Sequence, residues 1–301
     1  MSMTPRSRAE WMLISVTIVW GSTFVISKDL LQYVSPFAYI TVRFGIASLL
    51  FAALAFRSLR TISRAVILRG SILGFLMFAG FATQTVGLQV TSASKSAFIT
   101  GMMVVFTPLC QLLIERRAPR IGNVIGIGLV TVGLYLLTSP EGSEFNWGDG
   151  LTLLCAITFG LYIVYLDIYG KQYDAAHLTL IQFVSTFVFG AIGAVLVEPM
   201  RFELTNGVAG ELAYLILFPT IVALYVQTRY QKDTTPTRSA IIFSIEPVLA
   251  AGFAYVLLGE RIGAVGAVGA ALIFAGLLVS ELWDVVVRRS RTVPDVGASK
   301  G

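Results

Sequence analysis

Long apolar runs recur along the whole chain and constrain its fold more than any other feature. Runs of about 20 residues can cross a bilayer hydrocarbon core of about 30 Å as helices. Only 13% of the 301 residues are charged and 56% are hydrophobic, whereas a soluble domain carries about 25% charged residues. The alternating runs of about 10 residues that mark an outer-membrane barrel are absent. The sequence therefore predicts an all-α integral membrane protein.

Hydropathy along the chain indicates ten transmembrane helices joined by short loops. They cover residues 11–31, 36–56, 67–90, 96–114, 121–138, 149–169, 176–197, 211–230, 237–258 and 262–283. The basic N-terminal segment is followed by no small-residue cleavage site, so we expect an uncleaved first span rather than a signal peptide.

Lysine and arginine sort between alternate loops. Seventeen lie on one side: Arg6, Arg8, Arg57, Arg60, Arg64, Arg69, Arg116, Arg117, Arg120, Lys171, Arg229, Lys232, Arg238, Arg288, Arg289, Arg291 and Lys300. Four lie on the other: Lys28, Lys95, Arg201 and Arg261. Because basic loops remain cytoplasmic, we expect both termini in the cytoplasm. The net charge of +5 then reflects membrane orientation, and we expect no nucleic-acid partner.

The second half of the chain repeats the first. KSAFI (95–99) matches RSAII (238–242) at an offset of 143 residues, and WG (20–21) matches FG (159–160) at an offset of 139. Each half has five spans, an odd number, so the halves enter the membrane from opposite sides, as in the inverted repeats of many transporters. We expect a cytoplasmic segment at 1–10, repeats at 11–139 and 140–285, and a cytoplasmic tail at 286–301.

Several short motifs carry a family resemblance. They are the WGS-F start of the first span (Trp20 to Phe24), Arg43, the KSAF start of the fourth span, IEPVLA (245–250) and LLGER (257–261) with its glycine-rich last span. On these motifs, residues 10–285 resemble the EamA-type, ten-helix members of the drug/metabolite transporter superfamily. The fourth span departs from the pattern, since it ends in IERRAPR (114–120) rather than a second LLGER. The resemblance implies a bacterial inner-membrane transporter or exporter of small metabolites, with amino acids, aromatic ones included, among the family's best-known substrates.

Two charged residues inside spans are candidates for coupling or gating, because charge within a bilayer is costly and usually functional. Glu246 is a candidate proton or substrate-amine site, and a structural hydrogen bond to a neighbouring helix is the alternative. Arg43 is a candidate of the same kind, with a structural tie between helix ends as the alternative. Each lies about 10 Å into its span from opposite ends, so a direct ion pair requires kinked helices.

Prolines and glycines inside the spans suggest bends and close packing. Pro108, Pro219 and Pro247 each remove a backbone donor and kink a helix, which provides either hinges for gating or a fixed shape. Glycines in the fifth and tenth spans, such as Gly126 and Gly269, permit close helix approach. We expect these two spans to pack against each other or across a dimer rather than to line a cavity.

Aromatic, amide and hydroxyl side chains gather on single faces of several other spans. Buried polar groups need partners, which either a wet cavity or neighbouring helices supply. We expect the following to line a substrate cavity: Trp20, Thr23, Phe24, Phe81, Gln84, Thr100, Met103, Phe159, Tyr162, Tyr225 and Glu246, with Gln227 beside them on the eighth span. Trp20 shares a helical face with Thr17, Gly21 and Phe24, so we expect it to face the cavity rather than lipid.

These features together predict a secondary transporter or facilitator, which the family resemblance implies is in the bacterial inner membrane. We expect it to export amino acids or similar small metabolites by alternating access, as a monomer or homodimer whose partners are the substrate and membrane lipid. Cys110 and Cys155 form no CxxC, and HExxH and Walker motifs are absent, so we expect no catalytic residues, metal or cofactor. The alternatives are an intramembrane enzyme or a flippase acting on a lipid-linked or other amphipathic substrate, or a solute channel.

Overall fold

The computed structural model describes residues 4–56, 62–138, 146–258 and 263–291. Within these ranges the regular structure is helical, and an isolated antiparallel bridge joins Val34 to Phe202. The predicted boundary between the repeats at residue 139 lies outside the described residues, as do four of the basic residues used to orient the chain: Arg57, Arg60, Arg261 and Lys300.

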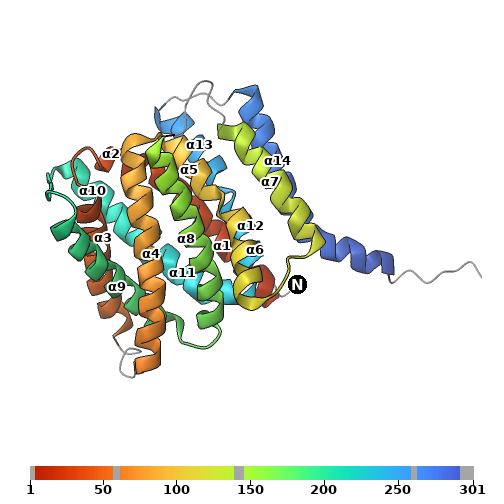
Figure 1. The fold of residues 1–301 in the computed structure, drawn as a ribbon, viewed down its shortest axis with the longest axis horizontal. Helices are drawn as coiled ribbons and strands as arrows, with labels where there is room; N and C mark the ends of the chain where they lie inside the picture. Colours follow the sequence, from red (N-terminus) through yellow and green to blue (C-terminus); the bar gives the residue numbers. More distant parts are fainter. Residues whose placement is uncertain (1–3, 57–61, 139–145, 259–262, 292–301) are drawn as a thin grey trace, which may run out of the picture.

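The helices form ten successive spans, as predicted (Figure 1). In chain order these are α1 (Pro5–Gly21) with α2 (Thr23–Leu30), α3 (Pro36–Ala55), α4 (Arg64–Val90), α5 (Ala93–Gly101) with α6 (Met103–Glu115), α7 (Ile121–Thr138), α8 (Trp147–Gly170), α9 (Ala175–Leu196), α10 (Asn206–Leu215) with η2 (Ile216–Val222), α11 (Ala223–Tyr230) and η3 (Gln231–Asp233), α12 (Pro236–Phe243) with α13 (Glu246–Leu258), and α14 (Ala264–Arg291). In the described ranges, seven of these stretches are long and apolar enough to cross a membrane unaided. The shorter apolar stretches Ile121–Leu136 and Ala264–Ser280 add to them.

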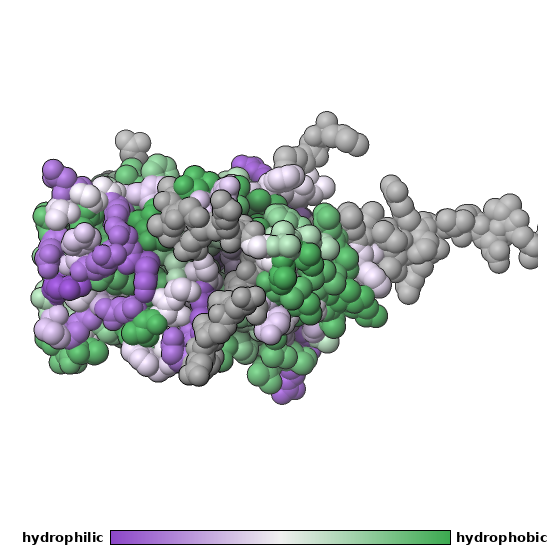
Figure 2. Space-filling view, turned by 90° about the horizontal axis from the view of Figure 1, so that it is seen from above, coloured by the Kyte–Doolittle hydropathy of each residue, from purple (hydrophilic) through white to green (hydrophobic). Residues whose placement is uncertain are grey.

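Helix ends define two ends of the bundle. The N-terminal end carries residues 5–10 and the starts of α4, α9 and α12, and the far end carries the starts of α3, α5 and α8. Figure 2 looks onto the far end and shows hydrophilic residues gathered over the α10 side, with hydrophobic residues over α7 and α14. The apolar sides of the bundle are the surface that lipid covers.

The two halves interlock rather than standing apart. By the internal repeat, α4 corresponds to α11 and α8 corresponds to α1. α4 packs on α8, and the equivalent pair α11 and α1 also packs together. Likewise α6 packs on α8, while α12 and α13 pack on α1. The central helices of one half are therefore completed by those of the other.

Two helix breaks occur at matching places in the two halves. The fourth span breaks at Met102, between α5 and α6, and the ninth breaks at Ser244–Ile245, between α12 and α13. Pro247 explains the second break, because its missing N–H would have bonded the carbonyl of Phe243, the last residue of α12. A Cβ atom placed on Gly101 would lie 3.0 Å from Cγ of Pro247, so the two breaks touch.

The α7–α14 pair depends on glycine for its close approach. A Cβ atom on Gly133 would lie 2.6 Å from the carbonyl oxygen of Gly269, and one on Gly126 would lie 2.7 Å from that of Gly276. Backbones meet directly at these points, so the predicted packing of the fifth span on the tenth is confirmed. The pair stands at one side of the bundle (Figure 1), away from the centre.

The outermost helix boundaries differ from those expected. α1 begins at Pro5 rather than at residue 11, because the Thr4 side chain accepts a hydrogen bond from the Ser7 backbone and Pro5 suits the first helical position. α14 continues to Arg291 rather than ending near residue 283. Parts of the segments 1–10 and 286–301, expected outside the spans, therefore extend the first and last helices.

Candidate functional site

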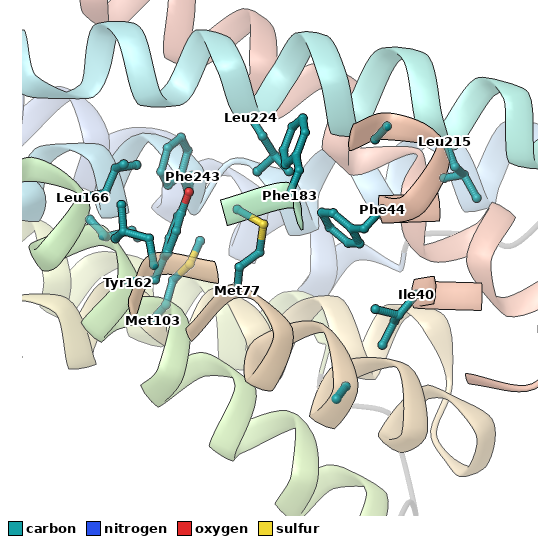
Figure 3. Close-up of a cluster of buried hydrophobic side chains, with 14 of the residues drawn as sticks. Ile40, Phe44, Met77, Met103, Tyr162, Leu166, Phe183, Leu215, Leu224 and Phe243 are labelled. Atoms are coloured by element: carbon teal, nitrogen blue, oxygen red, sulfur yellow. The ribbon is translucent and has the colours of Figure 1, made fainter. Parts of the chain in front are cut away.

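A cavity lies where the two helix breaks meet. Its free volume is about 70 Å³, and it is lined from seven of the ten spans. The lining residues are Trp20, Thr23, Arg43, Met77, Phe81, Gln84, Thr100, Met103, Phe159, Tyr162, Ile163, Leu224, Gln227, Phe243 and Glu246. Figure 3 shows Tyr162, Met103 and Phe243 lying together with Met77 beside them, although they come from four different helices.

Most lining residues fall into pairs related by the internal repeat. The pairs at an offset of 139 are Trp20 with Phe159 and Thr23 with Tyr162; those at 143 are Phe81 with Leu224, Gln84 with Gln227, Thr100 with Phe243, and Met103 with Glu246. A cavity lined by matching positions from both halves lies on the axis that relates them. Transporters built from inverted repeats hold their substrates at such a midplane junction.

Nine of the eleven side chains predicted to line a cavity lie on this one. Phe24 lines a smaller neighbouring space instead, together with Ser27, Tyr39 and Leu88. Tyr225 does not line this cavity: its ring lies 5.5 Å from that of Phe51 in a separate groove. Successive residues of a helix point about 100° apart, and Leu224 is the residue of this turn that faces the cavity.

Trp20 faces the protein interior, as its helical face predicts. Its indole N–H donates to the carbonyl of Pro219 at 3.0 Å, and its ring meets that of Phe243 edge-on at 5.3 Å. The helix is interrupted just after it, at Ser22, whose hydroxyl contacts the Tyr214 hydroxyl at 2.8 Å. The small polar residues after Trp20 thus connect the first span to the eighth.

Pro219 supplies the backbone carbonyl that accepts the hydrogen bond of Trp20. It lies inside η2, a seven-residue π-helix, a rare form that often marks functional sites. Because Pro219 has no N–H, the carbonyl of Leu215 lacks its usual donor, and the Thr220 hydroxyl donates to it at 2.7 Å. Pro219 therefore shapes one wall of the cavity by local backbone geometry.

Arg43 is buried and held in a fixed position. Its Nε donates to the Thr220 hydroxyl and its Nη1 to the Tyr39 hydroxyl, both at 2.6 Å. The guanidinium also lies over the Phe81 ring, 4.9 Å from its centre. A charge so oriented by neutral partners keeps its electrostatic attraction for an anion in the cavity.

Glu246 is the first residue of α13 and lines the cavity directly beside the break. Within the part of the chain that the structure describes, its carboxyl group makes no hydrogen bond and no ion pair, neither with Arg43 nor with the backbone near Pro247. The expected structural alternative, a tie to a neighbouring helix, is thus absent from the described contacts. A buried carboxyl group facing a cavity is suited to receive a cationic group.

The predicted prolines differ in what they do. Pro247 accompanies a break and Pro219 a π-helix, but Pro108 lies within α6 without interrupting it. The break in the fourth span falls at Met102 instead, one residue after the glycine that packs on Pro247.

Four lining residues were not expected: Met77, Ile163, Leu224 and Phe243. Met77, Ile163 and Leu224 are aliphatic, so polar and aromatic faces do not indicate them. Phe243 is aromatic, but it follows a short polar helix start. The repeat carries a signal for two of them, because Leu224 and Phe243 match the expected residues Phe81 and Thr100 at an offset of 143.

Comparison with known proteins gives a family match over nearly the whole chain. The EamA-like transporter family matches residues 7–139 and again residues 146–282. The two matches correspond to the two halves that share the cavity.

Curated relatives match over most of their own length. An uncharacterized transporter of Archaeoglobus fulgidus is 34% identical over 277 residues, covering 92% of this chain and 87% of that one. A Chlamydia muridarum protein named as an S-adenosylmethionine/S-adenosylhomocysteine transporter is 24% identical over 299 residues, covering 91% and 92% respectively. A protein crystal structure superposes with a TM-score of 0.79 at 17% identity, covering 95% of this chain and 99% of that one, which shows a shared fold.

Proposed function

This chain belongs to the EamA-like transporter family, and from that premise we propose that it is a secondary transporter that moves a small metabolite through the central cavity by alternating access. The observation that carries the proposal is the cavity itself, which lies between two helix breaks and is lined by matching residues of both halves. A site on the axis between inverted halves can face either side of the membrane in turn.

The lining supports a substrate with a cationic group and an apolar body. Glu246 offers a carboxyl group without a partner among the described residues, and Arg43 supplies a fixed positive charge to the same space. Trp20, Phe81 and Phe159 add aromatic surface, which attracts cations and apolar rings alike. An amino-acid zwitterion with an aromatic side chain combines these three properties, so we propose amino-acid export, aromatic amino acids included.

A second candidate substrate is S-adenosylmethionine, because the Chlamydia relatives are named as transporters of it and of S-adenosylhomocysteine. It is also an amino acid, with a further cationic centre and an aromatic base. The unpartnered Glu246 carboxyl and the aromatic walls suit this chemistry as well. The two candidates differ in size and in the second positive charge, which a transport panel resolves.

The distribution of basic residues supports an orientation with the N-terminal end of the bundle in the cytoplasm. Arg8, Arg64, Arg69 and Arg120 lie at that end, and they belong to the seventeen basic residues that the sequence assigns to one side of the membrane. We propose the bacterial inner membrane as the location, with both termini cytoplasmic.

Transport of a defined panel by the purified protein in liposomes tests this function. We expect uptake of labelled phenylalanine, tryptophan or S-adenosylmethionine above that of empty liposomes. Glu246→Gln should lower it at least about tenfold, since the loss of a charged hydrogen bond in a buried site costs about 1.5–3 kcal/mol. Glu203→Gln, at an exposed position outside the cavity, is the matched control and should transport normally.

No transport of any amino acid or sulfonium compound would contradict the substrate class. Equal loss in Glu246→Gln and Glu203→Gln would contradict the role of the cavity carboxyl group.

A further inference from the structure

We propose that two largely buried ion pairs related by the internal repeat are the locks of the two gates, and that they open alternately. The N-end pair joins Glu10 to Arg238, and the far-end pair joins Asp149 to Lys95. This inference rests on the proposed alternating-access function and assigns it specific residues.

The N-end pair connects the start of the first span to the start of the ninth. Nη1 of Arg238 lies 2.9 Å from Oε1 of Glu10, and 7% and 13% of the two side chains are exposed. Thr234 adds a longer hydroxyl contact to the same Glu10 oxygen at 3.5 Å. Nη2 of Arg238 also donates to the carbonyl of Ser280 in α14 at 3.2 Å. The N-terminal end is thus fastened across three spans.

The far-end pair connects the start of the fourth span to the start of the sixth. Nζ of Lys95 lies 2.6 Å from Oδ2 of Asp149, whose side chain is fully buried. The Thr91 hydroxyl donates to the other Asp149 oxygen at 2.6 Å. The Asn146 backbone N–H donates to Oδ2 at 2.8 Å, so the carboxylate is held from several directions.

The repeat relates the cation, the hydroxyl and the carboxylate of one group to those of the other. Lys95 corresponds to Arg238 and Thr91 to Thr234 at an offset of 143, and Glu10 corresponds to Asp149 at an offset of 139. Each group thus has a cation, a hydroxyl and a carboxylate in equivalent places at opposite ends of the bundle. Two equivalent fasteners on opposite membrane faces are what alternating gates of an inverted repeat require.

The cations stand on separate half-helices that lead to the cavity. Lys95 lies on α5 and Arg238 on α12, each of which ends at a break. Five residues beyond each cation, at Thr100 and Phe243, the same half-helix reaches the cavity, a distance of about 7.5 Å along the axis. A substrate that contacts these residues therefore touches the segments that carry the locks.

In this structure both locks are formed and the cavity between them is small. Its free volume of about 70 Å³ is well below the roughly 300 Å³ of the smallest common ligand pockets. Admission of a metabolite requires one half-helix to move, and with it the pair that anchors that half-helix. If the pairs had a purely structural role, breaking either one would not change from which end the cavity is accessible.

Side-specific labelling of a cavity cysteine distinguishes these roles. In a background with Cys110 and Cys155 replaced by serine, Met77→Cys places a thiol on the cavity wall. A membrane-impermeant maleimide is applied to oriented vesicles from each face, and the ratio of the two labelling rates is measured. Arg238→Gln should raise labelling from the N-terminal end relative to the far end, and Lys95→Gln should shift the ratio in the opposite direction. We expect changes of about tenfold, the effect of losing a hydrogen bond between charged groups.

Milder variants keep the test decisive if a glutamine variant fails to fold. Thr234→Val and Thr91→Val leave both ion pairs intact and remove only the hydroxyl contact to the carboxylate. They should shift the ratio with the same opposite signs and smaller size. Shifts of the same sign at both ends, or unchanged ratios in well-folded variants, would overturn the proposal. Labelling needs no substrate, so this result is independent of whether any metabolite of the panel is transported.

Discussion

At the scale of single residues, some polar groups that line the cavity have hydrogen-bond partners and others do not. Arg43 is held by Tyr39 and Thr220, and Trp20 by the carbonyl that Pro219 presents. Of these three residues, Glu246 is the one whose polar end has no partner among the described residues. The residues with partners fix the shape of the site, and the carboxyl group is left to interact with what enters it.

This difference leads to a prediction about coupling. If Glu246 carries a proton in exchange for substrate, a pH gradient across the liposome membrane should drive transport in the wild-type protein. One exchanged proton per substrate corresponds to at most about tenfold accumulation per pH unit. Glu246→Gln should remove this dependence, measured as the initial uptake rate with and without the gradient. An undiminished gradient effect in the variant would show that protons are coupled elsewhere.

At the scale of elements, the polar and aromatic pattern of the sequence was sufficient to indicate most of the cavity wall. This pattern indicated nine of the eleven predicted residues that line one cavity. Polar side chains in lipid-buried helices need partners, and a cavity that admits water supplies them. The breaks were harder to predict. Ser22 and Met102 interrupt their spans without a proline at the break, and the π-helix around Pro219 changes which residues of the eighth span face inward. Ser22 contacts Tyr214, and Gly101, next to Met102, packs on Pro247. One span's sequence does not contain such contacts between distant segments.

The α7–α14 pair gives a prediction about packing. Gly133→Ala would place a Cβ atom 2.6 Å from the Gly269 carbonyl oxygen, and relieving such an overlap costs about 1–3 kcal/mol. Gly128→Ala is the matched control on the same helix, since nothing lies within 4 Å of its added Cβ atom. Thermal unfolding in detergent should therefore show a lower midpoint for Gly133→Ala and an unchanged or higher one for Gly128→Ala. Equal midpoints would mean that the two helices can separate at little cost.

At the scale of the whole molecule, the repeat organises both the site and its closure. The same two sequence offsets, 139 and 143 residues, relate the paired cavity residues and the two ion pairs. The sequence alone indicated the repeat but gave no reason to connect Glu10 with Arg238 or Asp149 with Lys95. Those contacts form when the halves interlock, since each pair joins a residue of the first half to one of the second.

Substrate exchange across a membrane tests the central claim most directly, because a carrier with one alternately exposed site behaves differently from a channel. Liposomes holding the purified protein are loaded with unlabelled substrate, and entry of a trace of the same labelled compound is followed over time. The alternating cavity predicts a transient accumulation of label above its external concentration, absent from liposomes without internal substrate. Label that only equilibrates, at a rate independent of internal substrate, would contradict the account and indicate a channel.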